Sequence, residues 1–310
     1  DNASLTFFNF HTGEVFQNYF QTVNPGLRLG DTANSIAISG NRGYIVMNGS
    51  NTLEVIEVST AKSLGRVILR GNPSPRNAVI LNDTLGFVTA LFTDEVIRFN
   101  PSTLQETGRI AVGPAPEGIV VSGNRLFVAN SGLGDIRAGE PGAGTVSVVD
   151  IETGREMARV PVLPNCTLIK KSPEGFLFVS GTGSYTNAAV TGLAILDPAG
   201  LRVIDTLRVG GHPTDFVLGR SGLGYVLTDS AVVKFNWRAR QVVDAHFIPK
   251  EKLGQPAWFS AIALAESRKE LYIGNARNFT TNGEVICFDF DGNEKFRFPT
   301  KLNPGTLYFK

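Results

Sequence analysis

The chain repeats one arrangement of short apolar runs, and a repeat of fixed length decides the architecture before any single motif does. In the clearest copy, the runs RLFVAN at residues 125–130 and TVSVVD at residues 145–150 each end in a polar residue. A short run at residues 159–162, then Pro164 and a further run at residues 167–170, complete the copy and begin the next. Runs of β-branched and aromatic residues bounded by Gly, Pro, Asn or Asp are typical of β-strands.

Two marks of this arrangement recur along the chain, at intervals of roughly 40–50 residues. A polar residue ends the third run of each copy, where its side chain can accept backbone hydrogen bonds and nucleate a hairpin. These residues are Asn9, Glu57, Asn100, Asp150, Asp197, Asn236 and Asp289. The link to the next copy carries a proline, namely Pro25, Pro73, Pro116, Pro164, Pro213, Pro256 and Pro304. Each set has seven members, so the sequence predicts an all-β fold, a seven-bladed β-propeller forming a single domain over residues 1–310.

The second run has only six recognisable copies, and the missing one belongs to a blade shared by the two chain ends. We expect residues 306–309 to supply the first strand of this last blade, residues 5–10 its third and residues 15–20 its fourth. Its second strand should lie upstream of Asp1, in a segment removed by processing or trimming. A ring closed in this way hides its sheet edges. One helical turn at most is expected, at residues 249–253.

Composition and charge argue against several classes of function. Lys and Arg number 29 against 28 Asp and Glu, whereas nucleic-acid-binding domains usually carry a clustered basic excess. No apolar run approaches the roughly 20 residues that span a bilayer, so no transmembrane segment is expected. With 3 His and 2 Cys, the chain has few side chains for a metal or for acid–base catalysis, and no metal site is predicted. Cys166 and Cys287 lie two repeats apart and are expected to be separate buried thiols.

The repeated runs also carry a family resemblance. Residues 125–130 and 145–150 resemble the YVTN-type repeat of surface-layer-like, YncE-like bacterial propellers, and residues 43–57 repeat the likeness. Residues 2–8, 30–35 and 303–305 are similar to a narrower group of Bacteroidetes cell-surface propellers, some of which are lipoproteins that capture cobalamin beside an outer-membrane transporter. The resemblance implies an exported protein of the cell surface or periplasm. It also implies cobalamin or a similar corrinoid as a bound ligand, and an outer-membrane protein as an alternative partner.

In a propeller of this strand order, the links between blades and the loops from second to third strands open on one face. Several of these segments are long, at residues 131–144, 181–192, 249–260 and 274–283, and long loops in compact folds are often functional. They combine aromatic rings, which supply contact area, with Arg and Asn side chains, which fix orientation. The candidate ligand-binding residues are Asn34, Arg76, Asn77, Arg137, Tyr185, Asn187, Trp258, Phe259, Arg277, Asn278 and Phe279. The alternative is structural: Trp258 and Phe259 could plug the ring, and the polar residues could satisfy strand ends.

The sequence therefore favours a non-catalytic propeller that captures a small molecule or docks a partner protein. A second hypothesis is a lyase or hydrolase in which His212 acts as general base with Glu117 or Asp215 in hydrogen-bond reach. A third is a structural or adhesive surface module. No G-x-S-x-G sequence is present, and residues 289–293 resemble part of a calcium loop but occupy a hairpin position common to all copies.

Overall fold

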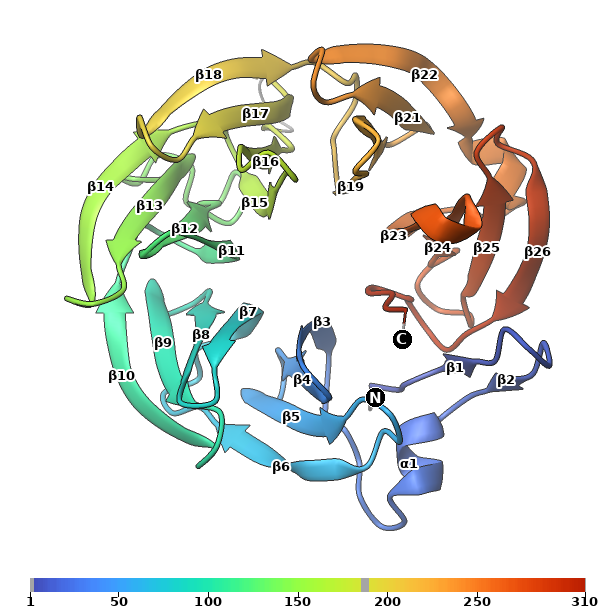
Figure 1. The fold of residues 1–310 in the computed structure, drawn as a ribbon, viewed down its shortest axis with the longest axis horizontal. Helices are drawn as coiled ribbons and strands as arrows, with labels where there is room; N and C mark the ends of the chain where they lie inside the picture. Colours follow the sequence, from blue (N-terminus) through green and yellow to red (C-terminus); the bar gives the residue numbers. More distant parts are fainter. Residues whose placement is uncertain (1–2, 185–189, 310) are drawn as a thin grey trace.

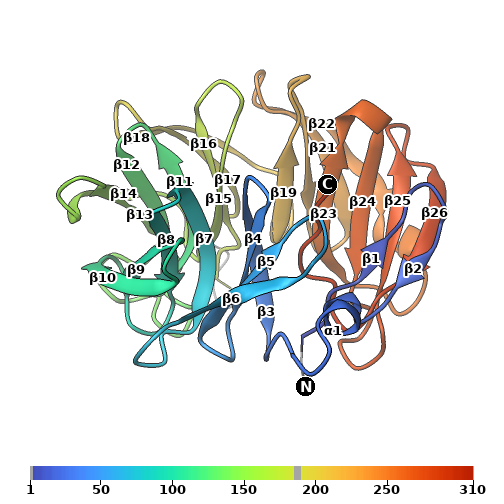
Figure 2. The same ribbon diagram turned by 60° about the horizontal axis from the view of Figure 1, so that its bottom comes forward.

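The computed structural model describes residues 3–184 and 190–309, and its regular secondary structure is almost entirely β-strand. Six four-stranded antiparallel sheets stand radially in a ring, so the fold is a β-propeller (Figure 1). Seen from the side, the strands of each sheet run between the two faces of the ring (Figure 2).

The strands of each sheet follow one another in the sequence and pair in that order. The first sheet holds β3 (Ala33–Ser39), β4 (Arg42–Met47), β5 (Thr52–Glu57) and β6 (Ser63–Ile68), and the second holds β7 (Pro75–Asn82), β8 (Leu85–Ala90), β9 (Glu95–Asn100) and β10 (Gln105–Ala111). The third holds β11 (Pro116–Ser122), β12 (Arg125–Asn130), β13 (Thr145–Asp150) and β14 (Arg155–Pro161), and the fourth β15 (Cys166–Lys171), β16 (Leu177–Gly181), β17 (Gly192–Asp197) and β18 (Arg202–Leu207). The fifth holds β19 (Asp215–Leu218), β20 (Leu223–Leu227), β21 (Ala231–Asn236) and β22 (Gln241–Pro249), and the sixth β23 (Phe259–Ala265), β24 (Glu270–Asn275), β25 (Glu284–Asp289) and β26 (Glu294–Pro299).

The middle strands are apolar at successive positions because each sheet packs on both faces. In β12, Leu126 and Val128 join the core on one side of the sheet, while Phe127 and Ala129 join the core on the other. The first strand of each sheet lies nearest the centre of the ring and the fourth lies outermost (Figure 1). Outer strands such as β14 alternate between exposed and less exposed residues, as expected of a strand with one solvated face.

The prediction of seven blades is wrong. Over the described residues the chain forms six four-stranded sheets and one two-stranded sheet, made of β1 (Phe7–Phe8) and β2 (Val15–Phe16). Residues 306–309 were expected to supply a first strand but pair with no strand. Of the expected fourth strand, the first two residues form β2 and the last two begin the short helix α1 (Tyr19–Val23).

The helix replaces the strand because of where its side chains are buried. Asn18 adopts a left-handed backbone conformation with φ 54°, which interrupts the extended run. Phe20 is then fully buried beside Leu29 and Ile45 of the first sheet's core. Asn24 fixes the end of α1, since its amide donates to the carbonyl of Ala61 at 2.9 Å. Alternation of aromatic residues in the sequence could not reveal this docking.

Both chain ends lie in the sector between β26 and β3 (Figure 1). Phe8 of β1 stacks on Phe298 of β26 with ring centroids 4.4 Å apart. The C-terminal segment bridges two inner strands: the Ser260 hydroxyl donates to the Pro304 carbonyl at 2.9 Å, and the Thr306 hydroxyl donates to the Asn34 carbonyl at 3.3 Å. Aromatic stacking and side-chain hydrogen bonds therefore join the two chain ends to the neighbouring sheets.

Other local predictions are confirmed in part. The 3₁₀ turn η1 (Lys250–Leu253) lies at the expected place, but the prediction of one helical turn at most is wrong, because α1 and the turn η2 (Glu266–Arg268) are also present. Cys166 and Cys287 are separate buried thiols. Among the helices of the described chain, none has the length and apolar character needed to cross a membrane.

Candidate ligand-binding face

The links between sheets and the loops from second to third strands emerge on one face of the ring, which we call the loop face. This follows from strand direction: each first strand begins at that face, each second strand ends there, and each third strand leaves from it. All described candidate residues lie in these segments or at the adjacent strand ends. Tyr185 and Asn187 lie outside the described residues.

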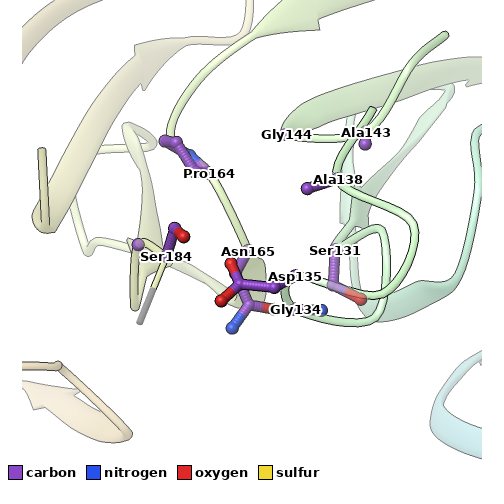
Figure 3. A pocket seen from close by; sticks show the side chains of 10 residues that line it. Ser131, Gly134, Asp135, Ala138, Ala143, Gly144, Pro164, Asn165 and Ser184 are labelled. Atoms are coloured by element: carbon purple, nitrogen blue, oxygen red, sulfur yellow. Dashed lines mark hydrogen bonds between the residues drawn. The ribbon is translucent and has the colours of Figure 1, made fainter. Parts of the chain in front are cut away.

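A hollow opens on the loop face between the third and fourth sheets, and we call it the inter-blade hollow (Figure 3). Its volume is about 160 Å³. Three segments form its walls: the β12–β13 loop, the link into β15, and the chain that follows β16. The lining residues are Ser131, Gly134, Asp135, Ala138, Ala143, Gly144, Pro164, Asn165, Gly183 and Ser184.

Glycines and hydrogen bonds give the β12–β13 loop its shape. Gly132 and Gly134 have φ of 68° and 64°, a region that glycine adopts without steric cost. The buried Ser131 hydroxyl donates to the Ala115 carbonyl at 3.0 Å, which ties the start of the loop to the preceding link. On the opposite wall, Asn165 accepts a hydrogen bond from the Gly134 amide at 3.1 Å. The hollow is therefore bounded by segments that are bonded to one another.

Arg137 anchors the same loop to the neighbouring second sheet. Its guanidinium pairs with Asp94 and with Glu140, each at 2.6 Å. Partial burial opposes ionisation of Asp94, but the hydrogen bonds from Arg137 and from the Ala115 amide outweigh it and lower the pKa of that carboxyl. The same ion pairs raise the pKa of Arg137. Arg137 thus binds two carboxylates of its own chain, an engagement that its position in a long loop did not predict.

A second feature of the loop face is a group of exposed aromatic residues. Trp258 and Phe279 are each 47% exposed, and their rings meet edge to face with centroids 5.4 Å apart. The Lys250 ammonium lies 4.9 Å from the Trp258 ring. Phe259, the next residue in the chain, is only 4% exposed and belongs to the core between the fifth and sixth sheets, so its ring is not presented to a ligand.

The polar neighbours of these rings are largely occupied. Arg277 pairs with Glu284 at 3.2 Å. The Asn278 side-chain oxygen accepts hydrogen bonds from the backbone amides of Thr280 and Thr281 and from the Thr281 hydroxyl, and so shapes the β24–β25 loop. The Arg277 guanidinium and the Asn278 side-chain oxygen are therefore both engaged in contacts within the protein.

The candidate residues at the inner strands join adjacent sheets. The Asn34 amide donates to the Arg76 carbonyl at 2.7 Å, and the Arg76 guanidinium pairs with Glu117 at 2.9 Å. The Asn77 amide donates to the Glu117 carbonyl at 3.3 Å. These contacts link the starts of β3, β7 and β11, which is the structural alternative that the sequence left open.

The acid–base arrangement around His212 differs from the predicted one. His212 Nδ1 lies 2.6 Å from Asp229 Oδ2, and the His212 backbone amide donates to the same oxygen at 3.0 Å. Glu117 is bonded to Arg76, and Asp215 pairs with Lys170 at 2.7 Å. The predicted His212 partners are therefore engaged elsewhere. Asp229 was missed because the β20–β21 loop is too short to stand out, although its position opposite the His212 link follows from the repeat.

Across the described residues, no group of three or more His, Cys, Asp or Glu could hold a metal ion. Asp289 Oδ1 accepts hydrogen bonds from the amides of Asp291 and Asn293, so that segment is the predicted hairpin turn. A wider hollow of about 540 Å³ lies outside the loop face, beside β6, and is lined by Gly26, Leu27, Arg28, Ser63, Gly65 and Arg66.

Residues 1–186 match a family described as "Domain of unknown function (DUF5074)". The chain belongs to this family. Comparison of the DUF5074 chain with curated proteins finds no match. The β-propeller part of the resemblance is confirmed, whereas kinship with the YVTN-repeat propellers stays a prediction.

Solved structures similar to this DUF5074 chain are propellers of low sequence identity. Hydrazine synthase of Kuenenia stuttgartiensis is 18% identical with a TM-score of 0.73, and the match covers 91% of each chain. A quinonprotein alcohol dehydrogenase-like protein of Bacteroides thetaiotaomicron is 13% identical with a TM-score of 0.72, covering 96% of this chain and 74% of that one. At such identities the likeness shows the fold alone.

Proposed function

We propose that this chain is a non-catalytic binding propeller of the bacterial cell surface or periplasm, and that it binds a small molecule or a partner protein on the loop face. The observation that carries the proposal is the inter-blade hollow. Loops of two neighbouring sheets flank it, and the hydrogen bond from the Gly134 amide to Asn165 joins its two walls. Preorganised concavities between structural units are common binding sites.

The size of the hollow limits what it can hold. At about 160 Å³ it is smaller than the roughly 300–1,000 Å³ of a site that encloses a drug-sized ligand. A corrinoid, the ligand implied by the resemblance, would lie across the loop face and insert only a side group. A small metabolite or the tip of a partner's loop would fit within it.

The ionic groups of the loop face support binding over catalysis. Arg137, Arg76 and Lys170 each pair with a carboxylate from a neighbouring sheet. Charges used in this way link neighbouring sheets, which is a structural role. The exported location rests on the resemblance of the repeats.

The test is calorimetric titration of the protein with cobalamin and related corrinoids, comparing the parent with Ala138→Phe. The new ring fills the hollow from an exposed loop and should weaken binding at least tenfold. Ala239→Phe, in a hairpin turn on the opposite face, is the matched control and should bind like the parent. If titration with every corrinoid gives no binding heat, the proposal that the ligand is a corrinoid is wrong. If Ala138→Phe binds a corrinoid as tightly as the parent, the ligand binds outside the hollow.

An enzyme remains the second candidate, and the His212–Asp229 pair is the observation in its favour. A carboxylate that holds an imidazole is an arrangement used in general base catalysis. Both side chains lie on the loop face, so a substrate held there could reach them.

A further inference from the structure

The exposed aromatic residues described above form a compact unit, which we call the aromatic corner: Trp258, Phe279 and Lys250. They come from three segments of the loop face, namely η1, the link into β23 and the β24–β25 loop. The two rings are half-exposed although they touch each other. The aromatic corner lies in the sixth sheet's loops, away from the inter-blade hollow between the third and fourth sheets.

Backbone hydrogen bonds hold the rings at the surface. The Trp258 amide donates to Asn275 Oδ1 at 2.9 Å, and the Trp258 carbonyl accepts from the Ala276 amide at 2.9 Å. The Phe279 amide donates to the Ala276 carbonyl at 3.0 Å. The rings are thus presented by a bonded framework, which lowers the entropy that a ligand must remove on binding.

The β24–β25 loop carries backbone strain at this point. Phe279 has φ of 63° and Arg277 has φ of 54°. Residues other than glycine occupy this left-handed region less often, because their Cβ atoms crowd the backbone. The positive φ at both residues helps to set the course of the β24–β25 loop beside Trp258.

The charge of the aromatic corner is the Lys250 ammonium, and no described carboxylate forms an ion pair with it. Over the described residues, no carboxylate lies within ion-pair distance of the Lys250 ammonium, and the adjacent Glu251 does not pair with it. Arg277, which is nearby in the β24–β25 loop, differs because it pairs with Glu284. The corner therefore offers two apolar rings beside one cation that forms no ion pair with a described residue.

We propose that the aromatic corner binds a small aromatic carboxylate. The ligand's ring packs against Trp258 and Phe279, and its carboxylate pairs with the Lys250 ammonium. Ring contacts supply area and geometry, and the ammonium selects an anion over a neutral or cationic ring. This inference deepens the proposed function and rests on one part of it, namely that the loop face binds ligands.

The two tryptophans provide the readout. Trp258 is half-exposed, whereas Trp237 is 2% exposed and its indole N–H donates to the Gly219 carbonyl at 2.8 Å. Titration with benzoate, at constant ionic strength, should change the emission of Trp258 in a saturable way. Benzamide, which is neutral and of nearly the same shape, should bind about fivefold more weakly. In Trp258→Phe, the remaining Trp237 emission should not respond to either probe.

Variants of Lys250 test the charge. Lys250→Gln should bring benzoate affinity down to that of benzamide, and Lys250→Arg should keep most of the preference. Equal affinity for the two probes in the parent, an unchanged preference in Lys250→Gln, or no saturable response to benzoate would each overturn the proposal. Ala138→Phe should bind benzoate like the parent. If benzoate fails while corrinoid binding is still lost in Ala138→Phe, the proposed function stands and only this inference falls.

Discussion

Two loops on the loop face stand at the same position of the repeat, between a second and a third strand, but differ greatly in length. Residues 131–144, between β12 and β13, form one wall of the inter-blade hollow, while residues 228–230, between β20 and β21, form a tight turn. In the tight turn the Thr228 hydroxyl donates to the Ala231 carbonyl and accepts from the Ala231 amide. The long loop instead bonds to a neighbouring sheet through Arg137.

The strands beneath these loops are alike. Both second strands end in fully or nearly fully buried residues, and both third strands pack against the fourth sheet's cores. The frame is thus repeated while the loop is varied, so stability belongs to the strands and recognition to the loops. The substitutions below test this division, in order of decreasing effect.

Phe127→Ala and Phe235→Ala should give the largest effects, and effects of similar size. Each ring is fully buried, Phe127 in the second strand of the third sheet and Phe235 in the third strand of the fifth sheet. Loss of a buried phenylalanine ring costs about 3–5 kcal/mol, because contacts are lost and a cavity remains. Urea unfolding of the two variants and the parent measures this. A cost at Phe235 less than half that at Phe127 would contradict the equivalence of the two sheets.

Arg137→Ala should cost about 1 kcal/mol, because it leaves the half-buried Asp94 without its partner in the neighbouring sheet. Arg159→Ala is the matched control, since Arg159 pairs only with Glu156 of its own strand. The control should change the free energy of unfolding less. Equal losses in the two variants would show that the cross-sheet pair contributes no more to stability than an ion pair within one strand.

The Arg137 contribution should also depend on pH. The pKa of Asp94 is lowered in the folded protein from its usual 3.8, so the pair stabilises fully above about pH 3.8. That stabilisation is lost as the pH falls through the lower folded-state pKa. Urea unfolding at pH 7 and near pH 3 should therefore bring the parent and Arg137→Ala closer together in acid. If the difference in the free energy of unfolding between the parent and Arg137→Ala is the same at both pH values, a group other than Asp94 determines it.

Asp229→Ala, in the tight turn, should have the smallest effect. It removes both contacts to His212, but its side chain is 51% exposed, so water replaces the lost partner. The expected cost is no more than about 1 kcal/mol, measured by thermal unfolding. A larger loss would show that the short loop contributes more to stability than its length suggests.

The sequence predicted the hairpins well because their signal is local. Asn100 accepts hydrogen bonds from the amides of Ser102 and Thr103, and Asn236 does the same for Arg238 and Ala239. Each turn depends on residues two or three positions away, which the repeat displays directly.

The blade count failed for the same reason. Asn9 accepts hydrogen bonds from the amides of His11 and Thr12, so the predicted turn forms between β1 and β2. Pro304 lies in a segment bonded to Ser260, as a link would. Both marks are real, but a turn does not specify how many strands join its sheet. Counting turns therefore overcounted four-stranded sheets by one.

The candidate site was predicted only in outline. The loop face and the exposed Trp258 follow from the repeat and from loop length. The partners of Arg76 and Arg137 lie 41 and 43 positions away, in neighbouring sheets. Such pairs are one repeat apart, so the spacing contained a signal, but only the packed structure selects which carboxylate is near. Lys250 was missed because nothing in the sequence places its ammonium over Trp258.

The packing of β12 has a practical consequence for tracking motion in this ring. Leu126 and Phe127 are neighbours in the chain but belong to different interfaces, one toward the second sheet and one toward the fourth. Probes placed at adjacent positions of a single strand would therefore report separately on its left and right contacts. A ligand that wedges two blades apart would disturb one of the two signals and leave the other as its own reference.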